Sequence, residues 1–160
     1  KAMGPGHATT ALTARQLDAV FLPDPAPAIL EVNGNGKIVA MSGEMWPNHV
    51  CCVLLVRGDL IRDHPELVKE IIRIHIKATE FINENPEETA EIASRKLGLA
   101  KETIIYSMEK SDILYLHDPN IALPVMEAYA NEHYSLGYIR RPLTGEDLVD
   151  VTLYDEIMSE

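Results

Sequence analysis

Four side chains of this sequence combine a suitable chemical type with a position where small molecules bind: His7, Asp24, Trp46 and His49. His7 follows two glycines at the start of a predicted helix, where backbone N–H groups and the helix dipole attract anions. Asp24 ends an apolar run, and its carboxylate can accept a hydrogen bond from an amine or N–H of a ligand. Trp46, the only tryptophan, lies with His49 in a predicted loop. An aromatic ring there can cover a small ligand, and a histidine can donate to an anion.

Each of these residues also has a structural interpretation. His7 can be a solvent-exposed loop histidine, and Asp24 can cap the helix that begins near Pro25. Trp46 can pack against the wall of a domain, and His49 can bond the neighbouring backbone. The sequence leaves both interpretations open for all four residues.

The elements that would position these residues follow from hydrophobic patterning. Three apolar segments, residues 17–22, 37–41 and 50–56, predict β-strands, and the last is continuous enough to be buried on both faces. Strands early and helices late predict an α/β chain that is helix-rich at its C-terminus. Open α/β sheets bind ligands at helix N-termini and at the carboxyl ends of strands, the expected positions of His7 and Asp24. Helical spacing, prolines and glycines predict helices over residues 8–16, from about 25 to 33, from about 63, and over 86–97, 101–110, 119–134 and from 144.

The two cysteines, Cys51 and Cys52, are adjacent in the third predicted strand. Neighbouring side chains of a strand point to opposite faces, so we expect the two thiols to be poorly placed to bond each other. We expect both to be small buried hydrophobes. No metal-ligand spacing, Ser-His-Asp arrangement or phosphate loop is recognisable in the sequence, which predicts no metal, no cofactor and no catalytic residues.

Composition excludes some function classes. The 160 residues include 25 acidic and 14 basic side chains, and the net charge of −11 argues against nucleic acid as a partner. No apolar run approaches the ~18–20 residues of a membrane span. The length fits one domain or part of a larger one. The first residues, Lys1-Ala2-Met3, do not read as a signal peptide, so we expect any leader to be absent from this chain.

The order of these motifs resembles the nitrate/sulfonate/taurine family of substrate-binding proteins of ABC importers. That family includes bicarbonate binders and binders of pyrimidine precursors, and its members are longer proteins with two lobes. The resemblance covers most of this chain but only the C-terminal half of such a protein. The matching residues are Gly4-Pro5-Gly6-His7, Ala11-Leu12, Leu17-Asp18-Ala19, Asp24-Pro25, Trp46-Pro47-Asn48-His49 and, in the long helical part, Asn85-Pro86-Glu87-Glu88.

The resemblance implies the C-terminal half of a type II periplasmic-binding-protein fold. Residues 1–49 would then be the end of the second lobe and the hinge crossing, and residues 50–160 the C-terminal part of the first lobe. The implied function is non-catalytic: capture of a small organic solute, of the sulfonate, taurine or heterocycle class, between two lobes that close and dock on an ABC permease. The implied location is periplasmic or otherwise extracytoplasmic, with a lipoprotein anchor as one form. His7, Asp24, Trp46 and His49 would face the cleft.

One departure from the family pattern narrows the range of expected ligands. In nitrate and bicarbonate binders the turn reads Trp-x-Asn-His-Pro-Glu-Lys, and the lysine supplies positive charge to the anion. Cys52 occupies the lysine position here. A small inorganic anion in a dry cleft needs an opposing charge or several donors, so the departure favours an organic solute over nitrate.

Three other functions stay open. Pyrimidine synthases of thiamine biosynthesis share the fold, but they carry a cysteine-rich iron motif that Cys51-Cys52 does not match. The effector domain of a transcription regulator and the sensor domain of a receptor are the other two. Because half of a two-lobed protein would expose apolar surface, we also expect a dimer or a swapped assembly.

Overall fold

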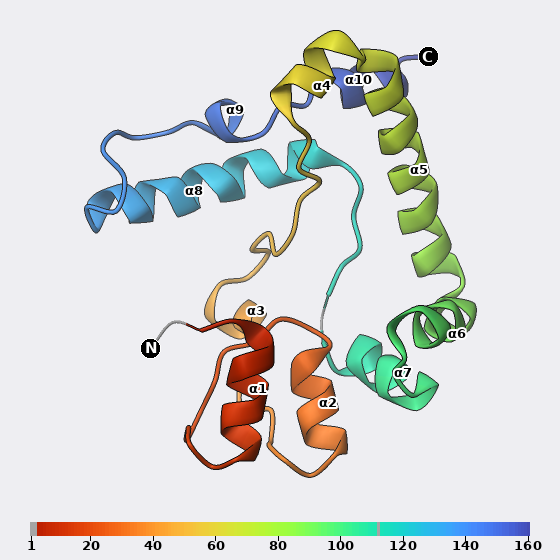
Figure 1. The fold of residues 1–160 in the computed structure, drawn as a ribbon. Helices are drawn as coiled ribbons and strands as arrows, with labels where there is room; N and C mark the ends of the chain where they lie inside the picture. Colours follow the sequence, from red (N-terminus) through yellow and green to blue (C-terminus); the bar gives the residue numbers. More distant parts are fainter. Residues whose placement is uncertain (1–2, 112) are drawn as a thin grey trace. The chain divides into compact units, whose positions relative to one another are not determined.

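The computed structural model describes residues 3–111 and 113–160, and Lys1, Ala2 and Asp112 lie outside this description. The described chain consists of helices joined by segments without regular structure (Figure 1). It divides into two compact units. The first unit comprises residues 1–45 and 82–114, and the second comprises residues 46–81 and 115–160.

The first unit is built around the helix α7, which packs against α2 and α6. Its small core contains Ala28, Leu30, Ala90 and Ile104, all of them buried. Proline and glycine set the helix ends: α6 has Pro86 in its first turn and ends at Gly98, which adopts a left-handed φ of 68°. The helices of this unit are α1 (Pro5–Thr13), α2 (Ala26–Val32), α3 (Ser42–Met45), α6 (Pro86–Leu97) and α7 (Lys101–Lys110).

The second unit contains the longest helix, α5, most of which belongs to it, and the helix α8 that carries the candidate site. Val68 of α5 is its best-buried large side chain, with 2% of its surface exposed. Thr144 begins α9 with a capping box, since its side chain and that of Asp147 bond each other's backbone N–H groups. The helices are α4 (Gly58–Asp63), α5 (Pro65–Glu84), the 3-10 helix η1 (Pro119–Ile121), α8 (Ala122–Ser135), α9 (Gly145–Leu148) and α10 (Thr152–Met158).

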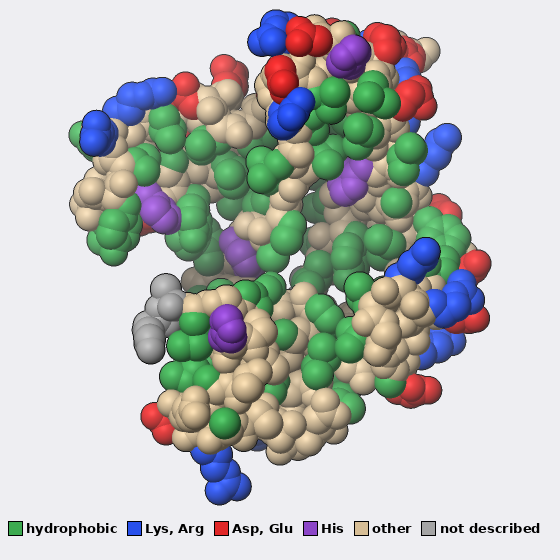
Figure 2. All heavy atoms as spheres, in the orientation of Figure 1, with side chains coloured by type: hydrophobic (Ala, Val, Ile, Leu, Met, Phe, Trp, Pro, Cys, Tyr) green, Lys and Arg blue, Asp and Glu red, His purple; other side chains and the backbone are tan. Residues whose placement is uncertain are grey.

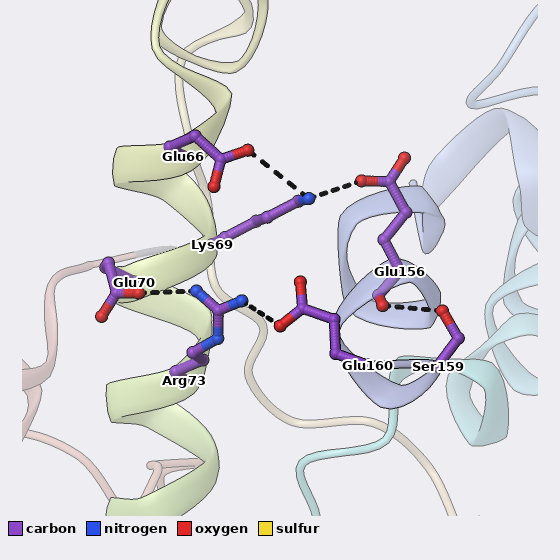
Figure 3. A network of polar contacts seen from close by, with 7 residues as sticks. All are labelled: Glu66, Lys69, Glu70, Arg73, Glu156, Ser159 and Glu160. Carbon is purple, nitrogen blue, oxygen red and sulfur yellow. Dashed lines mark hydrogen bonds and ion pairs between the residues drawn. The ribbon is translucent and has the colours of Figure 1, made fainter.

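Ion pairs connect the end of the chain to α5 (Figure 3). Lys69 Nζ lies 2.8 Å from Glu156 Oε2 on α10, and this pairing raises the pKa of Lys69. Arg73, one turn later on α5, pairs with Glu160 and also with Glu70 of its own helix. Because the Glu156 and Glu160 side chains are about half exposed, water screens both pairs, and they contribute modestly to the stability of the fold.

The three predicted strands are wrong for the described chain. Residues 17–22, 37–41 and 50–56 run without regular structure, and the described residues contain no β-strand. An apolar segment becomes a strand only when another strand pairs with its backbone groups, and no ladder forms here. The predicted burial of residues 50–56 is wrong as well, since Leu55 is 89% exposed and both cysteines are exposed. The helix-rich architecture therefore does not confirm the predicted α/β class.

Most predicted helices are confirmed. The predicted helix over residues 101–110 is α7, and the segment from Pro25 to Gly34 contains α2. The first helix begins earlier than predicted, because Pro5 suits the first helical position. The helix predicted from about residue 63 begins at Pro65, since Asp63 is the last residue of α4 and bonds Arg62. Among the described residues, no helix combines the length and apolarity that a membrane crossing requires.

Candidate functional site

His7 lies in the first turn of α1, in the first unit, and is exposed. Gly4 is the N-cap residue, in an extended conformation and without a side-chain capping bond. The ring is exposed, as the structural interpretation expected, but His7 belongs to a helix and not to a loop. Ligand contact by His7 therefore stays a prediction.

Asp24, also in the first unit, is half-buried and is held by α7. Ser107, a buried residue of α7, donates a hydrogen bond of 2.8 Å from Oγ to Asp24 Oδ1. The capping interpretation of Asp24 is wrong, because Pro25 is the N-cap residue of α2 and no side-chain capping bond is made. The carboxylate is instead given a defined orientation by a long-range partner.

Glu31 of α2 is a second carboxylate that is oriented by a hydrogen bond from a residue of α7. Tyr106 of α7 donates a 2.7 Å hydrogen bond to Glu31 of α2, and the backbone N–H of Ile38 donates to the other oxygen. The bond from Tyr106 is the main reason why the pKa of Glu31 lies below its ordinary value, and it raises the pKa of Tyr106. Since the folded pKa of Glu31 is lowered, the stability from these bonds is present above its ordinary pKa. It is lost as the pH falls through the lowered value.

Trp46 and His49 are brought together by one tight turn in the second unit. The backbone N–H of His49 donates to the Trp46 carbonyl at 3.4 Å, and Nδ1 of its ring lies 2.9 Å from the same oxygen. A carbonyl only accepts, so Nδ1 carries the proton. Asn48 occupies the left-handed region with φ of 60°, which asparagine tolerates well. The backbone-bonding interpretation of His49 is confirmed, and the turn fixes the direction of its ring.

Trp46 packs against α8 and forms one side of an aromatic hollow. Its ring centroid lies 5.1 Å from that of Tyr129, and Tyr129 lies 4.6 Å from His133 by the same measure. The aromatic hollow has a volume of about 390 Å³, within the range of small-molecule sites. Glu132 adds a carboxylate to its lining. The full lining is Trp46, Ala128, Tyr129, Glu132, His133 and Leu136.

Sequence reasoning missed Tyr129 and His133 as members of this site. The signal that could have found them is their spacing, since residues i and i+4 of a helix lie on the same face. His133 Nδ1 lies 2.9 Å from the Tyr129 carbonyl, which orients its ring along that face. The contact with Trp46 has no sequence signal, because it joins segments far apart in the chain.

The structure thus pairs Trp46 with His49 in the second unit, while His7 and Asp24 belong to the first. The prediction that all four face one cleft is not tested and stays a prediction. Within residues 3–111 and 113–160, no group of three or more His, Cys, Asp and Glu side chains has the arrangement of a metal site.

The bond between Ser107 and Asp24 gives a first testable prediction. Ser107→Ala and Asp24→Ala should each lower the free energy of unfolding by about 1–2 kcal/mol, because each removes a part-buried hydrogen bond. In urea denaturation, the double variant should lose less free energy of unfolding than the two single variants lose together. Asp18→Ala, at an exposed position, is the control and should change little. Strictly additive effects would show that the bond does not form.

Comparison with known proteins identifies the family. The profile of the NMT1-like family matches residues 2–97. Relatives named "Putative binding protein" occur in Brucella abortus (strain 2308) and in Brucella suis biovar 1 (strain 1330). Each is 23% identical over 104 residues, covering 64% of this chain and 33% of the relative. The chain spans about a third of the length of the curated relatives it matches. No solved structure matches the chain. Because the family profile covers more than half of its residues, the chain belongs to the NMT1-like family.

Proposed function

We propose that this chain is part of the solute-binding protein of an ABC importer. The family and the names of the relatives point to a binding protein, and the family match over residues 2–97 is the observation that carries the proposal. In the proposal, a small organic solute is captured between two lobes, and the closed form docks on the permease. The protein works outside the cytoplasm, in the periplasm or attached to the membrane as a lipoprotein, and it is not an enzyme.

The chain would supply one part of each lobe. Residues 1–49 form the end of the second lobe and the hinge crossing, and residues 50–160 the C-terminal part of the first lobe. The relatives are compatible with a longer protein of two lobes, because the chain spans about a third of their length. The two-lobed protein of this proposal is the full-length protein.

The proposed solute is organic, of the sulfonate, taurine or heterocycle class. Cys52, where nitrate binders have a lysine, supplies no positive charge. The aromatic hollow supports an organic solute, because Trp46 and Tyr129 offer apolar walls that such a solute can contact. A solute with an amine or ring nitrogen would suit the Glu132 carboxylate best.

Each predicted site residue has a role in this proposal. Trp46 covers the solute, and His49 stabilises the turn that holds Trp46 in place. Asp24, oriented by Ser107, accepts a hydrogen bond from an N–H of the solute. His7 contacts the solute at the N-terminus of α1. The competing enzyme function would need a cysteine-rich iron motif, and the sequence contains two cysteines in all.

The solute is best identified by native mass spectrometry of the full-length protein purified from its own host. We expect a fraction of the protein to carry one small organic molecule, which is released when the protein is unfolded. Chemical conversion of that molecule during incubation would contradict the proposal and favour an enzyme. Protein that carries no molecule and binds no organic solute on later addition would also contradict it.

Exposed apolar surface gives a second prediction. The chain exposes 11493 Å², whereas two separate folded units of half its mass each would expose about 9,600 Å² in total. Figure 2 shows hydrophobic side chains (green) on the surface of both units, and the most exposed include Phe21, Val39 and Leu55. We therefore expect another polypeptide segment to cover them. By itself, this chain should form dimers at micromolar concentration in light scattering, and a clean monomer would contradict this.

A further inference from the structure

The two cysteines lie much closer together than the strand prediction allowed. Cys51 and Cys52 are both exposed and in the thiol form, and the distance between their Sγ atoms is 3.5 Å. In a strand, neighbouring side chains point to opposite faces, which would separate the two sulfur atoms. The chain has no regular structure here, so both thiols point to the same side. They are the only cysteines of the sequence.

We propose that Cys51 and Cys52 form a redox modification site, which a small-molecule disulfide such as oxidised glutathione converts into a disulfide between the two neighbours. The thiolate of one cysteine attacks the small disulfide, breaks its S–S bond and releases one small thiol. The other cysteine then attacks the protein sulfur of this mixed disulfide and releases the second small thiol. The cysteines lose two electrons and two protons, and the small disulfide takes up both as two thiols.

The geometry favours the second step, ring closure, over a second glutathione adduct or a bond to another chain. The second sulfur already lies 3.5 Å from the first, so its attack is intramolecular and needs no encounter with another molecule. Exposure of both thiols gives the small disulfide access to either one. A stable adduct with two glutathiones, or a bond to another chain, would have to compete with this nearby partner.

The resulting disulfide is expected to be easily reversible. Neighbouring Cα atoms lie about 3.8 Å apart across a trans peptide bond, whereas disulfides usually join Cα atoms about 4.4–6.8 Å apart. Closing the ring therefore strains the backbone, and strained or exposed disulfides are the ones that thiols reduce readily. This property distinguishes a reversible modification from a bond that stabilises the fold.

The site is independent of the proposed solute, because it rests on the positions of the two thiols alone. It follows the Trp46–His49 turn directly, with one residue between His49 and Cys51. Ring closure fixes the backbone at residues 51–52 and is therefore expected to change the fluorescence of Trp46, the single tryptophan of the chain.

Intact-mass measurement tests the proposal. The reduced chain is equilibrated with mixtures of reduced and oxidised glutathione, and the remaining thiols are then blocked with iodoacetamide. Under oxidising conditions we expect a single chain that is lighter by two hydrogens and carries no blocking group. It should return to the dithiol form as the share of reduced glutathione rises. Two glutathione adducts, a disulfide-linked dimer, or two blocked thiols under oxidising conditions would overturn the proposal.

The variants Cys51→Ser and Cys52→Ser provide matched controls. Each should lose the cyclised species completely and stop at one mixed disulfide with glutathione. Because both positions are exposed, the helical circular-dichroism spectrum should be unchanged, which separates loss of the site from loss of the fold. A second probe, phenylarsine oxide, bridges two neighbouring thiols. We expect it to bind once to the unmodified chain and to neither variant at the same concentration, and equal binding to all three would overturn the proposal.

Discussion

Replacement of Gly145 by alanine is expected to lower the free energy of unfolding by about 2–3 kcal/mol. Gly145 is buried at the start of α9, against Leu123 of α8. A Cβ atom added to Gly145 would lie 2.6 Å from the Leu123 carbonyl oxygen and 2.9 Å from its carbonyl carbon. These are backbone atoms that cannot rotate away, so α9 would have to move. The movement would also disturb the hydrogen bond that the Gly145 N–H donates to Glu127.

Gly58 offers a matched control for this variant. It is the first residue of α4, as Gly145 is of α9, and a Cβ atom there would meet no atom of the described residues within 4 Å. Gly58→Ala should therefore be neutral or slightly stabilising, because alanine restricts the unfolded chain. Urea denaturation followed by circular dichroism measures both variants. Equal stability of the two would show that α8 and α9 do not pack as described.

Replacement of Trp46 by alanine should weaken solute binding by the full-length protein by about 1–3 kcal/mol, or roughly 5–150-fold. The variant removes one aromatic wall of the hollow and the contact between Trp46 and Tyr129. Trp46→Phe keeps a ring at this position and should retain most of the affinity. Competition binding with the co-purifying solute measures both effects.

Tyr134 provides the control for this prediction. It lies on α8 like Tyr129, and the two side chains have similar exposure, 46% and 48%. Tyr134 does not line the aromatic hollow, so Tyr134→Ala should leave the affinity unchanged. If Trp46→Ala left the affinity unchanged as well, Trp46 would only pack against α8, as its structural interpretation states.

The sequence predicted the helices well, because their signals are local. Pro86 and Gly98 bound α6, and Thr144 begins α9 through a capping box that is readable in four residues. Pro5 shows the limit of such reasoning, since the helix it begins was predicted to start three residues later. Helix ends depend on cap geometry that a sequence indicates only within a few residues.

Strands and contacts between distant residues could not be predicted with the same success. The run of residues 50–56 has the composition of a strand, but strand formation requires a partner that a local pattern does not name. The error at Cys51 and Cys52 follows from it, because the separation of their thiols was inferred from strand alternation. The bond between Asp24 and Ser107 and the packing of Trp46 on Tyr129 also join distant segments. The tight turn from Trp46 to His49 joins residues that are close in the sequence, and its backbone bond was therefore the easiest part of the site to predict.

Calorimetric titration of the full-length protein tests the central claim most directly. Taurine, an alkanesulfonate, a pyrimidine and nitrate are titrated in parallel into ligand-free protein, and Trp46→Ala is titrated with whichever compound binds. The proposed function predicts saturable binding of at least one organic compound at one site per protein, weakened in the variant, and little or no heat from nitrate. Tight nitrate binding without a response to any organic solute, or binding that Trp46→Ala leaves unchanged, would contradict the account.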